Sequence, residues 1–373
     1  MKFCIYSPYI PKHFGGGERY LLAVAKVLAK RGEVSIAVSG GRGMTRDHNQ
    51  RLKRLYEDFL GEKLSENINF VNSPLGVGGD FLEKLLWTKQ FDVMYYATDG
   101  SLFFSLAKRN ILHIQIPFGN KMSGWFDQLK LKNWQIKNTN SKFTKKTIEK
   151  NWRTKVDEVH WPVMIARDDF IKEKDLAKKQ KVILNVGRFF KQLHSKRQDV
   201  LVDIFAKLLE KSGAKDWQLV LIGNVEDQKF FEEIKDQIKK NKLKNIKILT
   251  KLSREDLLSW YKRASIYWHA TGFGVDEAKH PEKMEHFGIS TVEAMSYGCA
   301  PIVINKGGQK EIMSGDLREW LWEDQNECVS KTLKLIKSES LRGKIQKLAI
   351  KRATEFSEAK FEKTLWRMVG GGK

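Results

Sequence analysis

The segment EHFGISTVEAMSYG places two carboxylates around a glycine that precedes a helix-forming stretch. Gly288 breaks the chain after an apolar segment, Ser290 opens the predicted helix, and Gly298 closes it. A helix N-terminus that follows a glycine presents free N–H groups and a positive dipole, which suits a phosphate. Glu285 and Glu293 fall on a loop and on a helix, so they need not act as a hydrolytic pair.

Glu293 also fits a purely structural interpretation. The pattern Ser290-x-x-Glu293 is a capping box, in which two side chains satisfy the free N–H groups of a helix without any ligand. The residues alone leave both roles open, capping and ligand binding.

Two cations follow a predicted strand in the segment NVGRFFKQLHSKRQDVL. Arg188 offers a planar fork of donors and Lys196 a point charge, and fixed cations can stabilise the negative charge that develops on a leaving phosphate. In isolation, exposed cations in such a place are usually solvated. Lys191 and Arg197 are rival cations in the same segment.

Further candidates lie where other predicted strands end. Gly16 and Gly17, within Gly-Gly-Gly-Glu-Arg, precede a helix and let the backbone approach a ligand, although a plain strand–helix turn has the same composition. His113 ends the strand in ILHIQIPF, where a buried core histidine is the simpler interpretation. His269 and Asp99 hold comparable places after two other strands.

Residues 121–155 combine basic and aromatic side chains. Ten lysines or arginines stand against two acidic residues, Asp127 and Glu149. This mixture suits an anionic membrane interface, and it also suits single-stranded nucleic acid. The alternative is a solvated helix face whose aromatic side chains lie in the core. The aromatic residues are Trp125, Phe126, Trp134, Phe143 and Trp152.

The composition restricts the class of protein. The 373 residues are 41% hydrophobic and 11% aromatic, which excludes wholesale disorder. The net charge of +22 favours anionic partners such as nucleic acid, anionic lipid or phosphorylated ligands. Three scattered cysteines fit free thiols in a reducing cytosol, and the chain shows no secretion signal layout and no apolar run of the ~20 residues that a membrane span needs. We therefore expect a cytoplasmic protein.

Short apolar segments alternate with longer amphipathic ones along the chain, which is typical of βαβ units and parallel sheets. We expect helices at Arg19–Lys30, Asp199–Lys211 and Glu226–Lys240. Two such α/β domains in succession bind ligands at the carboxyl ends of their strands, so a cleft between them is the expected site. The predicted strands are 2–8, 34–39, 68–73, 91–97, 111–117, 134–141, 158–163, 182–189, 217–223, 245–251, 265–270 and 300–306.

Taken together, the motifs resemble retaining, nucleotide-sugar-dependent glycosyltransferases of family 4, the glycosyl transferases group 1 type, which have the GT-B fold. The family pattern E-x-F-G-x-x-x-x-E-A-M-x-x-G-x-x-P is matched from Glu285 to Pro301, and Gly307-Gly308-x-x-Glu311 resembles its G-G-x-x-E. The segment with Arg188 and Lys196 resembles its V-G-R…K-G-x-D. The form HPEKMEHFGISTVEAM is most similar to that of eukaryotic-type mannosyltransferases that extend lipid-linked oligosaccharides.

The resemblance implies an α/β protein with two Rossmann-like domains that face each other across a cleft. Residues 1–165 would form the acceptor-side domain, 166–180 a linker and 181–350 the nucleotide-sugar-binding domain. Residues 356–369 are expected to form a helix that crosses back to the N-terminal domain.

The resemblance also implies residue roles. Arg188 and Lys196 would hold the donor diphosphate, and Lys196 is preferred to its rivals because the Gln-Asp-Val-Leu after Arg197 aligns with the family. Glu285 would bind hydroxyls of the donor sugar, and Glu293 the ribose. Main chain near 249–252 would contact the base, and Lys251 there replaces a common glycine.

Other positions follow in the same way. Gly16 would contact the donor phosphate or the acceptor, His113 would lie beside the donor sugar, and the amides of Phe287–Thr291 would contact the diphosphate. The expected catalytic residues are Glu285, Arg188, Lys196 and His113. The expected donor-binding residues are Gly16, Gly17, Phe287, Gly288, Ile289, Ser290, Thr291 and Glu293.

The implied activity is metal-independent transfer of a hexose from a UDP- or GDP-linked donor to a hydroxyl acceptor, a glycolipid or a precursor of cell envelope polysaccharide. Configuration would be retained, and the donor's leaving phosphate would take the acceptor's proton, with no cofactor besides the donor. An anionic membrane surface is a further expected partner, which would place the enzyme peripherally on the inner face of the membrane.

Two other readings of the sequence remain. One is a nucleic-acid-binding protein, against which stands the lack of a helix-turn-helix, zinc-finger or RNP signature in the sequence. The other is a GT-B nucleotide-sugar epimerase or phosphorylase.

Overall fold

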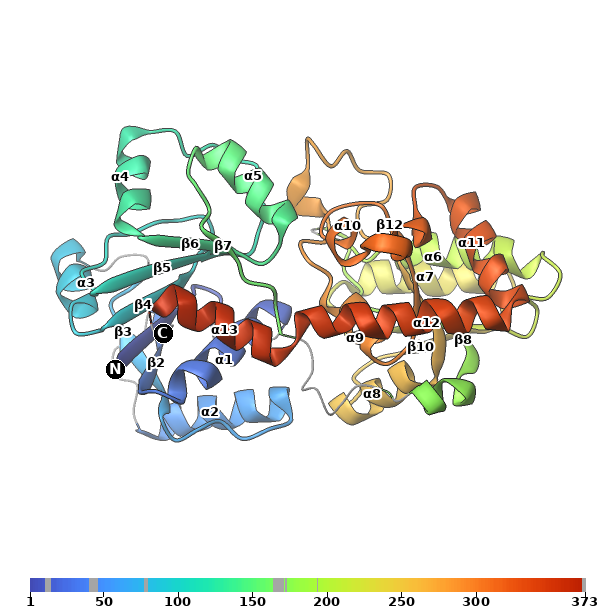
Figure 1. Cartoon of the computed structure of the whole chain (residues 1–373), viewed down its shortest axis with the longest axis horizontal. Helices are drawn as coiled ribbons and strands as arrows, with labels where there is room; N and C mark the ends of the chain where they lie inside the picture. The colour runs from blue at the N-terminus through green and yellow to red at the C-terminus, as the bar shows by residue number, and fades with distance from the viewer. Residues whose placement is uncertain are drawn as a thin grey trace. The chain divides into compact units, whose positions relative to one another are not determined.

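The computed structural model describes residues 1–10, 15–39, 46–76, 80–163, 171, 173–192 and 194–370 (Figure 1). The chain divides into two compact units, Met1–Val163 with Ala359–Lys373 and Met164–Glu358. Each unit is built on one parallel sheet covered by helices, as the alternation of apolar strands and amphipathic helices predicts.

The sheet of the first unit has the strand order β3-β2-β1-β4-β5-β6-β7, with every pair parallel. Its strands are β1 (Lys2–Tyr6), β2 (Glu33–Ser39), β3 (Ile68–Ser73), β4 (Val93–Ala97), β5 (Arg109–Ile114), β6 (Ile136–Thr139) and β7 (Glu158–Val159). Its helices are α1 (Gly16–Ala29), α2 (Arg46–Leu60), α3 (Phe81–Thr88), α4 (Trp125–Asn133), α5 (Lys142–Trp152) and α13 (Glu358–Val369).

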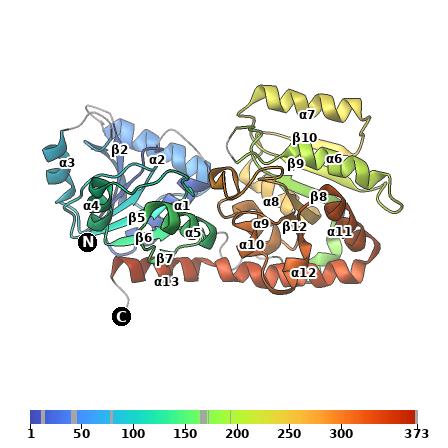
Figure 2. The same cartoon turned by 90° about the horizontal axis from the view of Figure 1, so that it is seen from above.

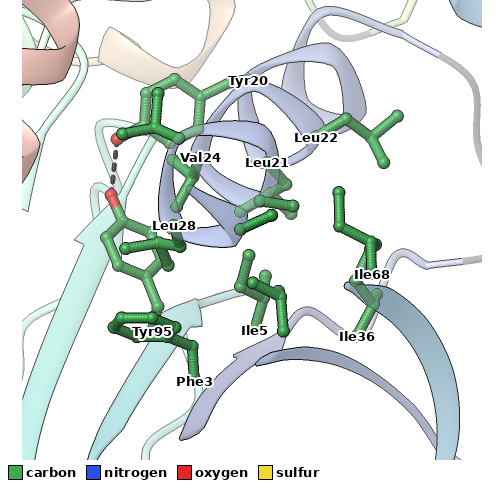
Figure 3. Close-up of a cluster of buried hydrophobic side chains, with 14 of the residues drawn as sticks. Phe3, Ile5, Tyr20, Leu21, Leu22, Val24, Leu28, Ile36, Ile68 and Tyr95 are labelled. Carbon is green, nitrogen blue, oxygen red and sulfur yellow. Dashed lines mark hydrogen bonds between the residues drawn. The ribbon is translucent and has the colours of Figure 1, made fainter. Parts of the chain in front are cut away.

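One core of this unit lies between the sheet and α1, where Leu21 lies over Ile5 and Leu22 faces Ile68 (Figure 3). A second core lies on the other face of the sheet, under α4 and α5 (Figures 1 and 2), and contains the buried residues Leu131, Trp134, Ile148 and Trp152.

Helix α13 contributes to the first of these cores although it ends the chain. Its predicted apolar face is buried, and the rings of Trp366 and Phe3 meet edge to face with centroids 6.4 Å apart. The carbonyl of Phe361 accepts a hydrogen bond from Nε2 of His160 at 3.0 Å. Helix α13, although it lies at the C-terminal end of the chain, is therefore part of the first unit.

The sheet of the second unit has the strand order β10-β9-β8-β11-β12-β13, also parallel throughout. Its strands are β8 (Gln180–Val186), β9 (Gln218–Ile222), β10 (Ile246–Leu249), β11 (Ala264–His269), β12 (Ala300–Ile304) and β13 (Leu321–Trp322). Its helices are α6 (Gln198–Leu209), α7 (Gln228–Lys240), α8 (Arg254–Arg263), α9 (Ile289–Ser296), α10 (Gln309–Ile312), α11 (Gln325–Lys337) and α12 (Glu339–Ala353), and α6 and α7 lie on one side of the sheet (Figure 2).

Residues 166–170 and 172 of the predicted linker lie outside the described residues. Its end forms a 3-10 helix, η2 (Glu173–Lys178), and Nζ of Lys179 then donates to the carbonyls of Tyr261, Ala264 and Tyr297 at 3.0, 2.8 and 2.5 Å. Within the described ranges, no helix has both the length and the apolar character needed to cross a membrane.

Candidate functional site

Lys196, Glu285 and His269 meet in the second unit, beyond the carboxyl ends of β8 and β11. Nζ of Lys196 lies 2.5 Å from Oε2 of Glu285, and Nε2 of His269 lies 2.8 Å from the same oxygen. The Lys196 and Glu285 side chains are only 15% and 14% exposed, and His269 is fully buried. Two widely separated motifs of the sequence are thus joined by one carboxylate.

The electrostatics of this cluster follow from burial and pairing. Burial alone would raise the pKa of Glu285, but Lys196 and His269 hold the pKa of that carboxyl well below its usual range. Burial lowers the pKa of His269 against the opposing effect of Glu285, so its ring is neutral near pH 7. Nε2–H then donates to Glu285, and Nδ1 has no partner among the described residues.

Glycines make this pairing sterically possible. A Cβ on Gly187 would overlap the side chain of Lys196, and one on Gly307 would overlap the carbonyl of Glu285. The N–H of Gly308 donates to that carbonyl at 2.7 Å. The V-G-R and G-G-x-x-E motifs therefore hold the lysine and the glutamate in place.

Arg188 lies beside this pair and is oriented by two partners. Its Nη1 donates to Oε2 of Glu226 at 2.8 Å, and its Nη2 lies 3.1 Å from Nε2 of His194. Burial, helped by His286, Lys196 and Arg188, lowers the pKa of His194 to about 3. His194 is thus a neutral acceptor for the guanidinium.

The sequence alone did not indicate His194. Neither its spacing nor its neighbours suggest a role, and only its position inside the Arg188–Lys196 segment could have drawn attention to it. The ring of His286, from the E-x-F-G motif, lies 5.1 Å from the ring of His194.

The rival cations are engaged elsewhere. Nζ of Lys191 pairs with Glu233 on the surface at 2.6 Å. Arg197 pairs with Asp199 at 2.8 Å and donates to the carbonyl of Phe273. Of the three cations, Lys196 is the one that pairs with Glu285.

Helix α9 begins at Ile289, one residue earlier than the sequence predicted. Gly288 is its N-cap, with φ of +120°, and a Cβ there would lie 2.5 Å from Nε2 of Gln309. The first amides of an α-helix have no acceptor within the helix, which leaves those of Ile289 and Ser290 suited to an anion. The amide of Thr291 already donates to the carbonyl of Gly288 at 3.1 Å.

Most side chains around the start of α9 already contact other residues of the chain. The hydroxyl of Ser290 bonds with that of Tyr267 at 2.7 Å, and the ring of Phe287 packs edge to face on Phe356. The buried hydroxyl of Thr291 has no partner among the described residues. The N-terminus of α9 therefore offers main-chain groups more than side chains.

The capping-box interpretation of Glu293 is wrong. Because Gly288 is the N-cap, the N3 position belongs to Thr291, and Glu293 lies two residues further along the helix. Its carboxylate is 3% exposed, accepts from Nη2 of Arg254 at 2.7 Å and accepts from the hydroxyl of Tyr261 at 3.2 Å. Both partners come from α8, and no motif of the sequence points to either.

In the first unit, Gly16 and Gly17 are the first two residues of α1. The N–H of Gly15 donates to Oε2 of Glu18 at 2.8 Å, so Glu18 caps this helix. A Cβ on Gly17 would lie 2.8 Å from Oε1 of Gln115, so a larger residue there would have to displace that side chain.

His113 lies near the end of β5 and is fully buried. Its Nδ1 is 2.6 Å from Oδ1 of Asn138, and its ring stacks on Tyr20 with centroids 4.1 Å apart. Burial lowers the pKa of His113 to about 4, and Nε2 has no partner among the described residues. Asp99, by contrast, is exposed and accepts from the N–H and hydroxyl of Ser101 in a turn.

The aromatic residues of 121–155 differ in burial, and Phe143 is half-buried. Trp134 and Trp152 are fully buried, so for these two the binding-surface interpretation is wrong and the alternative of aromatic side chains in the core is confirmed. Trp134 directly follows α4 and Trp152 ends α5, and both belong to the core on that face of the sheet, where apolar area is removed from water. Trp125 and Phe126 are 79% and 46% exposed.

The described residues contain no group of three or more His, Cys, Asp or Glu side chains that could hold a metal ion.

Comparison with known families identifies the class. The family of glycosyl transferases group 1 matches residues 166–352, half of the chain, and the protein belongs to this family. The resemblance predicted from the motifs is thereby confirmed. The chain is a glycosyltransferase of family 4, whose members take a sugar from a nucleotide-sugar donor.

Among individual relatives, the chain is 28% identical over 198 residues to a GDP-Man:Man(3)GlcNAc(2)-PP-Dol alpha-1,2-mannosyltransferase from Neurospora crassa. The match covers 46% of this chain and 33% of the relative, so the chain spans about a third of that protein's length.

Solved structures share the fold over the whole chain. HepE from Anabaena, in complex with UDP and glucose, has a TM-score of 0.69 at 15% identity and covers 100% of both chains. A glycosyltransferase from Rickettsia africae has a TM-score of 0.71 at 14% identity and covers 100% of this chain and 99% of its own. The predicted α/β fold of the GT-B type, with two Rossmann-like domains, is confirmed.

Proposed function

We propose that the protein transfers a hexose from a UDP- or GDP-linked donor to a hydroxyl acceptor with retention of configuration, the acceptor being a glycolipid or a polysaccharide precursor. The observation that carries the proposal is the buried pairing of Lys196 with Glu285, next to Arg188, at strand ends of the second unit.

Lys196 and Arg188 are the proposed diphosphate ligands. His194 and His269 are neutral, so the positive charge of this cluster comes from the lysine and the arginine. As the bond between the sugar and the diphosphate breaks, negative charge grows on the leaving group, and fixed cations stabilise it most at that moment. We propose that these cations and the start of α9 make a metal unnecessary.

Glu285 is the proposed ligand of the donor sugar. Its lowered pKa keeps it ionised, so it accepts hydrogen bonds from sugar hydroxyls and does not serve as a proton donor near pH 7. His269 orients it through the 2.8 Å contact. The leaving phosphate would then take the proton of the acceptor.

Glu293 is the proposed ribose ligand. Arg254 and Tyr261 hold its carboxylate in one orientation, and a carboxylate is the acceptor that ribose hydroxyls would require. The amides of Phe287, Gly288, Ile289 and Ser290 would face the diphosphate, with Thr291 completing the turn. In the first unit, Gly16, Gly17 and His113 remain the proposed contacts to donor and acceptor.

The names of the similar proteins suggest which donors to test first. The Neurospora relative is named for GDP-mannose, and HepE was solved with UDP and glucose. The resemblance of the segment HPEKMEHFGISTVEAM to eukaryotic-type mannosyltransferases favours GDP-mannose as the donor and a lipid-linked acceptor. With such an acceptor, the enzyme would act at the cytoplasmic face of a membrane.

The test is acceptor-dependent release of nucleoside diphosphate. Purified protein is incubated with GDP-mannose or UDP-glucose, with and without a lipid-linked glycan, and GDP or UDP is measured. Release that requires the acceptor supports the proposal. Release without an acceptor, or conversion of one nucleotide sugar into another, would favour an epimerase, and no binding of either nucleotide would overturn the proposal.

A further inference from the structure

Large apolar side chains gather on the surface of the first unit. Among the described residues, nine large hydrophobic side chains are exposed, and seven of them fall between positions 81 and 129. Three are on α3 (Phe81, Leu82 and Leu86), three on α4 (Trp125, Phe126 and Leu129), and Leu106 lies in the loop between β4 and β5. We call these seven residues the apolar patch.

The apolar patch is continuous across the two helices. The ring of Phe104 bridges them, with centroids 6.2 Å from Phe81 on α3 and 5.8 Å from Phe126 on α4. Phe126 in turn meets Trp125 at 5.5 Å. A connected exposed apolar surface of this kind is typical of an interaction site rather than of scattered surface residues.

Basic residues border the apolar patch. Nζ of Lys130 lies 4.7 Å from the ring centroid of Phe126, and Lys121 and Lys132 are exposed next to or within α4. Helix α5, on the same side of the sheet in both views (Figures 1 and 2), adds the exposed Lys142 and Lys146. The whole chain carries a charge of +22.

We propose that the apolar patch and its lysines dock the protein on a bilayer that contains anionic lipid. Tryptophan and phenylalanine with leucine enter the boundary between headgroups and acyl chains, and lysines at the rim attract anionic headgroups. Docking on a bilayer does not depend on the sugar-transfer reaction. It would, however, bring the enzyme to a lipid-linked acceptor.

The composition of the patch favours lipid over other partners. A second copy would bring lysines against lysines, which repel. Four of the seven residues are leucines, which cannot stack on bases as aromatic rings do. Aliphatic and aromatic side chains together match acyl chains.

The apolar part is tested by sedimentation with vesicles of phosphatidylcholine containing about a third phosphatidylglycerol. The double variant Leu82→Ser with Trp125→Ser should bind about tenfold more weakly, because it removes apolar area from the contact. Leu55→Ser is the matched control, since Leu55 is 45% exposed on α2. All these positions are exposed, and thermal melting checks that each variant folds.

The basic part is tested on the same vesicles. Lys130→Ala and Lys132→Ala should each weaken binding by about fivefold at low salt, with a smaller effect in high salt. Lys239→Ala with Lys240→Ala, on α7 of the second unit, is the control. The proposal is overturned if the wild type does not bind the vesicles, or if patch and control variants bind them equally. It is also overturned if the patch variants bind vesicles normally but no longer form a dimer or no longer bind an oligonucleotide.

Discussion

Two buried histidines, one in each unit, show how the same residue can serve different ends. His113 and His269 are both fully buried near the end of a central strand, and both have a lowered pKa and one ring nitrogen without a partner among the described residues. His113 contacts the neutral side chains of Asn138 and Tyr20. His269 contacts Glu285, which also holds Lys196.

The difference lies in the charge of the partner. Around His113 the contacts are uncharged and extend to the hydroxyls of Tyr20 and Tyr95, 2.6 Å apart (Figure 3), so disturbing this network is expected to affect folding first. Around His269 a carboxylate and an ammonium are held together with little exposure. Such a pair is costly to bury and is a frequent mark of a functional site.

The largest expected effect is on turnover in Lys196→Ala. Loss of this cation should lower kcat by about 10²- to 10³-fold, as does loss of one oxyanion donor in other enzymes, with a smaller change in donor affinity. Lys191→Ala is the matched control, because Lys191 pairs with Glu233 on the surface. Steady-state kinetics check this, and loss in Lys191→Ala with normal turnover in Lys196→Ala would show that the wrong lysine was chosen.

Glu293→Gln should weaken nucleotide binding by roughly 10- to 100-fold, because glutamine loses one acceptor oxygen and the charge. It should also lower stability by about 1–3 kcal/mol, since Arg254 loses its anionic partner while it is largely covered. Calorimetry and thermal melting measure the two effects.

Glu233→Gln, which breaks the exposed Lys191 pair, serves as the control for Glu293→Gln and should change little. A Glu293→Gln protein that melts early but binds nucleotide normally would leave Glu293 with a structural role alone.

The burial of His113 in its neutral form predicts that the stability of the protein depends on pH. His113 has a pKa of about 4 in the fold against an ordinary 6.5, so below pH 6.5 the unfolded chain binds a proton that the native state does not. Its contribution is present above pH 6.5 and is lost as the pH falls towards 4, by roughly 3 kcal/mol in total.

His113→Gln should therefore show a smaller loss of stability between pH 7 and pH 5 than the wild type. Urea unfolding at both pH values measures this. Parallel losses in the two proteins would mean that His113 is not buried in its neutral form.

The smallest expected effect concerns a loop after β10 in the second unit. Lys251 has φ of +55°, a left-handed conformation that costs a non-glycine residue about 1 kcal/mol. Lys251→Gly should raise stability by about that amount in urea unfolding. A loss of stability would show that the lysine side chain makes a favourable contribution of its own.

The sequence predicted most strands, because apolar runs of buried parallel strands are distinctive, but it missed β13, which pairs over two residues only. Its motifs also singled out Lys196, Arg188 and Glu285, and the first and last of these pair in the structure. It could not place the start of α9, because Gly288 as N-cap depends on how the loop fits against Gln309 in the folded chain.

Partners from distant elements were equally hidden from the sequence. Arg254 and Tyr261 reach Glu293 only once α8 and α9 have packed, and the spacing of these residues in the sequence does not predict that contact. In the basic and aromatic residues 121–155, the sequence likewise could not predict that Trp134 is buried and Trp125 exposed, because the two lie close together in the sequence, at the two ends of α4.

If Lys196, paired with Glu285, binds the donor diphosphate, the protein must distinguish GDP from GMP, and titration calorimetry measures this directly. The wild type should bind GDP about tenfold or more tightly than GMP, because the second phosphate contacts Lys196. This ratio should collapse in Lys196→Ala and persist in Lys191→Ala, and UDP with UMP is measured in the same way. An unchanged ratio in Lys196→Ala, with either base, would contradict the account.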